Sequence, residues 1–147
     1  MLGDARLDYA DWHAEADNRL TWMLGALGDR FGNDPVYVHL TRDRDAVIDS
    51  FRERHWGRIS ILRAFGLGII SRREPYTDDE WTHVAATYVD TVTANVRAFL
   101  AGRPRAITMS LEDPLGGFEQ LWQLGGVEGD YASACAEWGV QHNAWRS

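Results

Sequence analysis

The sequence predicts an α/β fold in which a small parallel sheet is flanked by helices. Two short runs, Val36–Thr41 and Ala106–Leu111, are apolar and carry β-branched residues, which is typical of buried strands. The segments before, between and after them have apolar residues at helical spacing. Strands that alternate with helices pair in parallel through right-handed crossovers, so the two runs are expected to lie side by side.

The helices are predicted from this spacing and from the residues that start or stop a helix. A looser alternation over Leu7–Ala16 predicts a third strand. The expected helices, in chain order, cover 20–31 after a cap at Asp17 or Asn18, 46–54 after a cap at Asp43 or Asp45, 81–100 with the longest apolar stripe, 114–124 from Pro114, and 131–138 after Asp130. The segment 59–70 is expected to be either a short helix or a packed loop, and 72–79 an exposed connection.

Length and composition indicate a single ordinary globular domain. The chain has 147 residues, of which 45% are hydrophobic and 25% charged, and no linker divides it. A net charge of −7 argues against nucleic acid or an anionic membrane as a partner. The lone Cys135, the acidic start and the lack of a long apolar stretch predict a soluble cytoplasmic protein. All fifteen basic residues are arginine, so lysine chemistry is excluded.

Arg42 and Ser50 form the most specific candidate site. Arg42 follows the predicted strand 36–41, and Ser50 lies eight residues further on, in the next predicted helix. A guanidinium fork and a hydroxyl close to a helix N-terminus can hold one anion together. The alternative is that Arg42 pairs with Asp43 or Asp45 and that Ser50 is a small residue on a packed face.

The segment Val-Tyr-Val-His-Leu-Thr-Arg-Asp, followed by Ala-Val-Ile-Asp-Ser-Phe, resembles the 3′-phosphate-binding segment of sulfotransferases that use 3′-phosphoadenosine-5′-phosphosulfate (PAPS). The later helix, the strand that ends in Leu-Glu-Asp-Pro and the helix after it are similar to the C-terminal part of that family's P-loop-type fold. The resemblance implies that Arg42 and Ser50 hold the 3′-phosphate of PAPS. It further implies a transferase that moves a sulfuryl group to a hydroxyl or amine acceptor, whose identity no residue indicates.

The chain departs from the family in one respect. Sulfotransferases have a 5′-phosphosulfate loop near the N-terminus, built from a strand, a Gly/Ser/Thr-rich turn and a helix, and nothing before Leu20 has that form. Residues 1–147 are therefore expected to be one incomplete sulfotransferase-like domain that is not active alone. Its small sheet would leave an edge to be covered by a second copy or a complementary chain. A non-catalytic nucleotide-binding or protein-interaction module, and a plain packing domain, are the alternatives.

His13, Glu15 and Asp17 form a second cluster. Residues two apart share one face of a strand, so an imidazole and two carboxylates could converge there. His13 or Glu15 is then a candidate general base for an acceptor hydroxyl, and the same groups could bind a metal ion. The alternative is a solvated strand end that leads into a capped helix. The cluster alone does not predict a bound metal ion.

Overall fold

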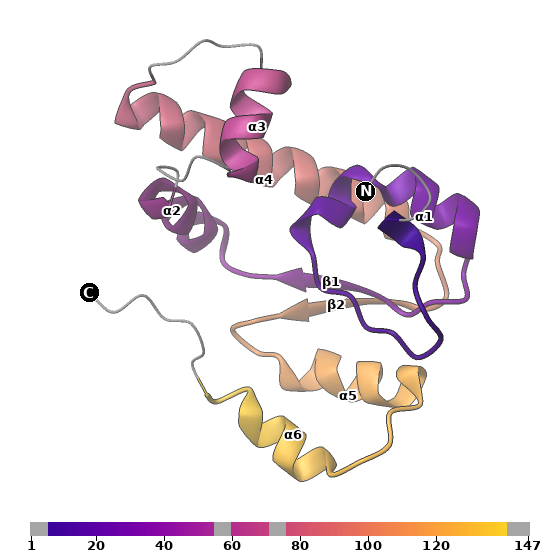
Figure 1. Ribbon diagram of the computed structural model, residues 1–147. Coiled ribbons are helices and arrows are strands. Elements are labelled where there is room, and N and C mark those ends of the chain that lie inside the picture. The colour runs from indigo at the N-terminus through magenta and orange to yellow at the C-terminus, as the bar shows by residue number, and fades with distance from the viewer. Residues whose placement is uncertain (1–5, 55–59, 71–75, 141–147) are drawn as a thin grey trace.

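The computed structural model describes residues 6–54, 60–70 and 76–140 and confirms the α/β class in this part of the chain. Helices α1 to α4 lie on one side of the two strands, and α5 and α6 lie on the other (Figure 1). No helix in these ranges is long and apolar enough to cross a membrane. The elements are η2 (Asn18–Trp22), α1 (Leu24–Phe31), β1 (Tyr37–Thr41), α2 (Arg44–Arg54), α3 (Ile61–Gly68), α4 (Asp78–Leu100), β2 (Ala106–Ser110), α5 (Leu115–Gly125) and α6 (Tyr131–Glu137).

The sheet has two parallel strands in the described part of the chain. β1 and β2 pair from Tyr37 opposite Ala106 to Thr41 opposite Ser110, and α2, α3 and α4 form the connection between them. Both predicted strands are confirmed, and so is their parallel pairing, but the prediction of a buried strand is wrong for β1, none of whose residues is buried. Because the strands run in the same direction, the segments that follow them emerge at the same edge of the sheet.

One face of the sheet is apolar but only half covered. Residues that pair across a sheet share a face, so Val38 and Leu40 of β1 lie beside Ile107 and Met109 of β2. Helix α5 packs on β2, where Ile107 and Met109 are buried. Val38 and Leu40 stay 36% and 49% exposed. The apolar surface of β1 therefore has no equivalent cover.

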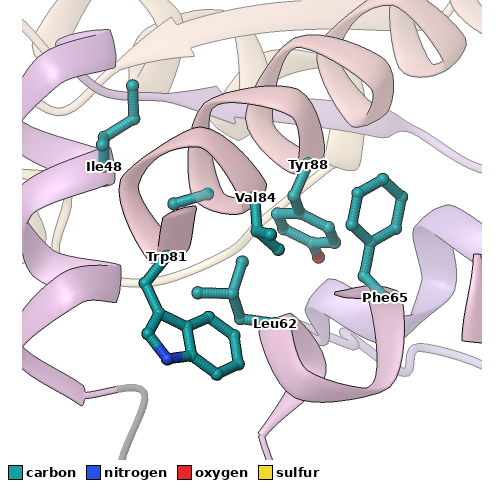
Figure 2. Packing of buried hydrophobic residues seen from close by; sticks show 7 residues of the cluster. Ile48, Leu62, Phe65, Trp81, Val84 and Tyr88 are labelled. Carbon is teal, nitrogen blue, oxygen red and sulfur yellow. The ribbon is translucent and has the colours of Figure 1, made fainter. Parts of the chain in front are cut away.

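The main core lies between α2, α3 and α4, on the other side of the strands. Leu62 of α3 is 1% exposed and points toward α4, close to Trp81 and Val84 (Figure 2). The apolar stripe predicted for 81–100 supplies most of the cluster, as its spacing required. The buried members are Ile48, Leu62, Phe65, Trp81, Val84, Ala85 and Tyr88.

Side-chain caps fix where several helices begin. Asp17 caps η2, Asp43 accepts the Ala46 N–H at the start of α2 (2.9 Å), and Asp130 caps α6. All three are among the caps that the sequence predicts. A carboxylate at this position accepts a hydrogen bond from a backbone N–H that has no partner inside the helix. Helix α4 starts with a reciprocal capping box between Thr77 and Glu80.

Two further predictions for elements are settled in the described residues. The segment 59–70 contains a helix, α3, which begins after Ser60, whose hydroxyl accepts the Arg63 N–H. The single helix predicted for 20–31 is wrong in detail, because the chain forms the short η2 first and α1 only from Leu24. Half of the exposed connection predicted for 72–79, residues 72–75, lies outside the described residues, and α4 already begins at Asp78.

The predicted third strand at Leu7–Ala16 is wrong. Residues 8–17 form a loop, and Trp12 turns the chain with a positive φ of 60°. The stretch has no β-branched residue and therefore little strand propensity. Ion pairs shape it instead: Arg6 binds Asp17 at 2.6 Å, closing the loop at its base.

Candidate functional site

Polar side chains from both strands meet at the carboxyl edge of the sheet. Arg42 directly follows β1, while Ser110 ends β2 and Glu112 follows it. Thr41 and Ser110 are opposite each other in the register, so the two strands end level. In parallel α/β sheets this edge is where ligands bind.

Glu112 connects the two strand ends. One carboxylate oxygen accepts the Asp43 N–H at 2.8 Å, and the other accepts the Ser110 hydroxyl at 2.5 Å. The pKa of Glu112 is lowered mainly by the Ser110 hydroxyl, then by the Asp43 N–H, and to a smaller extent by the charge of Arg42. Glu112 is therefore an anion at neutral pH and holds the segment that follows β1 against the end of β2.

The turn from β1 into α2 is fixed from both sides. Asp43 gives its N–H to Glu112 and uses its carboxylate to cap α2. Just before it, the carbonyl of Thr41 accepts the Leu111 N–H at 2.8 Å. Arg42 is thus held between two residues whose backbone is bonded to the segment after β2.

The acidic residues beside Arg42 are engaged elsewhere. Asp43 caps α2, and Asp45 lies 3.2 Å from the guanidinium of Arg44. Arg44 also binds Asp90 of α4 through two bonds of 2.7 and 2.8 Å, which raise the pKa of Arg44 and lower that of Asp90. Within the described ranges, no carboxylate lies at ion-pair distance from Arg42, whose side chain is exposed. Arg42 therefore does not form the ion pair with Asp43 or Asp45 that was the alternative to an anion site.

Ser50 lies further from the start of α2 than the sequence suggests. The helix begins at Arg44, so Ser50 is six residues along it, or about 9 Å along the axis. Its side chain is partly exposed. Arg42 and Ser50 are therefore on one continuous turn and helix but not in contact, and an anion held by both would have to lie along the side of α2.

His13 and Glu15 do come together, although not on a strand. In the loop 8–17, His13 Nε2 lies 3.1 Å from a carboxylate oxygen of Glu15, and its ring stacks on Tyr9 at 4.9 Å. Asp17 is not part of this pair, because Arg6 and Arg19 bind it. These two arginines account for the strongly lowered pKa of Asp17, with Arg19 contributing most.

The loop with His13 and Glu15 lies at the opposite end of the strands from Arg42. It packs beside α1, which precedes β1, with Tyr9 against Phe31. Figure 1 shows this indigo loop near the tails of the strand arrows, whereas Arg42 follows the arrowhead of β1. The structure therefore does not bring the candidate base to the candidate anion site. Within the described residues, no group of histidine, cysteine and acidic side chains could hold a metal ion.

A shallow cavity of about 310 Å³ opens between the sheet and the C-terminal end of α4. Its lining includes His39, Thr108, Arg97 and Arg103. Burial, and secondly the charge of Arg97, lower the pKa of His39, so this imidazole is neutral at pH 7. Arg103 donates to the carbonyls of Phe99 and Gly32, which gives it a structural role.

Sequence reasoning missed the role of Glu112. In the sequence, the Leu-Glu-Asp-Pro stretch points only to the family resemblance. An acidic residue just after a strand parallel to β1 also indicates a polar contact at the carboxyl edge of the sheet. Its partner Asp43 is 69 residues away in the chain, so only the parallel pairing of β1 and β2 could connect them.

Comparison with known proteins adds no relative. No family model, no curated protein and no solved structure matches the chain.

Proposed function

We propose that this chain is a sulfotransferase-like module that binds PAPS, or the bisphosphate nucleotide left after transfer, through its 3′-phosphate. Arg42 would supply the charged donor fork and Ser50 a hydroxyl further along α2. The observation that carries the proposal is the state of Arg42: it is an exposed guanidinium at the carboxyl edge of a parallel sheet, and its acidic neighbours are bound to other groups.

The turn around Arg42 supports this proposal. An arginine binds phosphate best when its backbone is already held, because less conformational entropy is then lost on binding. Glu112 and the β2 end hold the turn on one side, and the Arg44–Asp90 ion pair holds the start of α2 on the other. The carboxylate of Glu112 also adds a negative charge close by, so the nucleotide must gain enough from Arg42 to offset that repulsion.

Group transfer would require more than this site. In-line movement of a sulfuryl group to a hydroxyl or amine acceptor needs donors at the sulfonyl end, and each such donor is worth on the order of a hundredfold to a thousandfold in rate. The sequence has no Gly-rich turn with a basic residue ahead of Leu20. We therefore expect the chain alone to bind the nucleotide without transferring the sulfuryl group. His13 and Glu15 stay predicted general bases.

Titration with 3′,5′-adenosine bisphosphate tests the proposal. Isothermal titration should show binding by the wild type, weaker binding of 5′-AMP, and a loss of about 10- to 100-fold in affinity for the bisphosphate in Arg42→Gln. Arg30→Gln is the matched control, since Arg30 is exposed and pairs with Asp8 at the far end of the strands. Equal affinity of the wild type and Arg42→Gln would refute the role of Arg42.

A second function, protein interaction through the sheet, is favoured by a separate observation. β1 pairs only with β2 in the described residues, and its apolar side chains Val38 and Leu40 are exposed. An open strand edge with apolar side chains is a common docking surface for another chain. This function needs no nucleotide, and its test is therefore independent of the titration.

A further inference from the structure

The outer edge of β1 has the features of a strand that pairs with another strand. Tyr37 donates its N–H toward β2, and the carbonyl of Thr41 accepts from the β2 side. Because the direction of these groups alternates along a strand, Val38 and Leu40 direct their N–H and C=O groups to the outer edge. No strand in the described ranges lies there.

This edge also lacks the features that prevent pairing. Natural edge strands are protected by charged side chains, proline or bulges. The five residues of β1, Tyr37–Thr41, include no charged side chain apart from the titratable His39 and no proline, and they pair with β2 without interruption. Val38 and Leu40 are 36% and 49% exposed. They lie on the face of the sheet on which α5 packs against β2.

We propose that the outer edge of β1 binds a second copy of this chain, so that two β1 strands pair antiparallel around His39 and form a four-stranded sheet. The proposal gives the protein-interaction function a partner and rests on that function, not on nucleotide binding. A two-fold axis at His39 places Val38 opposite Leu40 of the other copy, and Leu40 opposite Val38. Each of these pairs can exchange two N–H···O bonds, which uses the outward groups of both residues.

The side chains and charges of the edge are self-complementary in this register. Val38 and Leu40 of both copies share one face, which buries the apolar surface left open in the single chain. Asp34 precedes β1 and Arg42 follows it, and both are exposed. Antiparallel pairing places the turn with Asp34 of one copy near the turn with Arg42 of the other, so the charges at the two ends of the paired strands are opposite. A parallel arrangement would instead place like charges together, and two-fold symmetry excludes it.

Sedimentation equilibrium over a range of protein concentrations tests the proposal. The wild type should associate to twice the chain mass of 16.7 kDa, and Leu40→Lys should weaken association by about tenfold or more, because two charges enter the apolar pairs. The control is Leu67→Lys, which adds the same charge at a similarly exposed leucine (43%) on α3. Circular dichroism of both variants checks that they fold.

A cysteine scan tests the register. In a Cys135→Ser background, which removes the chain's one cysteine, His39→Cys should form an intermolecular disulfide on mild oxidation. The two Cα atoms at the axis are expected about 4.5 Å apart, within the range for a disulfide. Thr108→Cys, on β2 and one strand further from the axis, should form none.

The outcomes separate this proposal from the nucleotide proposal. A wild type that stays monomeric at all concentrations, or an association that Leu40→Lys leaves unchanged, overturns the pairing. Disulfide formation at Thr108→Cys but not at His39→Cys overturns the register. Pairing of β1 with a strand from a different protein, seen as Leu40→Lys-sensitive binding by a monomeric chain, also overturns it. None of these results depends on whether 3′,5′-adenosine bisphosphate binds.

Discussion

The contact between α5 and β2 leads to a prediction that two neighbouring glycines should respond in opposite ways. A methyl group added at Gly117 would lie 2.7 Å from Cβ and 2.8 Å from Cγ of Met109, whereas nothing lies within 4 Å of one added at Gly116. Both residues are in the first turn of α5. Replacing either by alanine therefore changes helix propensity to a similar extent, and the variants differ mainly in the clash with Met109.

The size of the effect follows from these distances. Carbon atoms in contact prefer a separation of about 3.5–4.0 Å, so Gly117→Ala must push α5 away from β2 by roughly 1 Å. Such overpacking typically costs about 1–3 kcal/mol. Glycine to alanine in a helix gains up to about 1 kcal/mol. We expect Gly116→Ala to stabilise the protein, Gly117→Ala to destabilise it by up to about 2 kcal/mol, and the two to differ by about 1–3 kcal/mol.

Urea denaturation followed by circular dichroism measures this difference directly. Thermal unfolding provides a second measure, because 1 kcal/mol corresponds to about 2–4 °C in Tm for a chain of this size. The m-value should be the same for both variants, since the surface exposed on unfolding hardly changes. If Gly117→Ala is as stable as Gly116→Ala, the close packing of α5 on Met109 is not as described.

Three further changes test other parts of the fold. Leu62→Ala should lower the free energy of unfolding in urea by about 2–5 kcal/mol because it leaves a cavity between α3 and α4, while Leu67→Ala, at an exposed position, should change it by less than about 0.5 kcal/mol. Thr77→Ala should cost about 1 kcal/mol in the same assay through loss of the α4 cap; no loss would argue against the capping box. Because the folded protein resists protonation of His39, its stability should fall as pH drops below about 6.5, and this slope should be smaller in His39→Gln when urea midpoints are compared from pH 7 to pH 5.

Local sequence signals predicted most of the elements. Asp43 and Asp130 mark helix starts because a carboxylate next to free backbone N–H groups has the same effect in almost any fold. Both strands were recognisable because each is a short run with β-branched or aromatic residues. The false strand at Leu7–Ala16 shows the limit of such signals, since alternation of polarity without β-branched residues also suits a loop fastened by ion pairs.

The candidate site was predictable only in part. Arg42 could be placed at the end of β1 from its neighbours in the sequence. Asp43 and Asp45 leave Arg42 available because the Asp43 carboxylate caps α2 and Asp45 pairs with Arg44. The bond from the Asp43 N–H to Glu112, which holds the turn in place, spans 69 residues and could not be read from neighbouring residues. The distance of Ser50 from the start of α2 depended on where the helix begins, and a shift of two residues changes that distance by about 3 Å.

The long connection between β1 and β2 has a consequence for the order in which the chain folds. Closing a loop costs more entropy when more residues lie inside it, and the two strand ends are 69 residues apart. The contacts of α3 with α4, and of α2 with α4, enclose shorter loops and bury the main core. We therefore expect the helices to assemble first and the strand ladder to close late. The edge that carries Arg42 and Glu112 would then be absent from partly folded chains, so a ligand at that edge would select the fully folded protein.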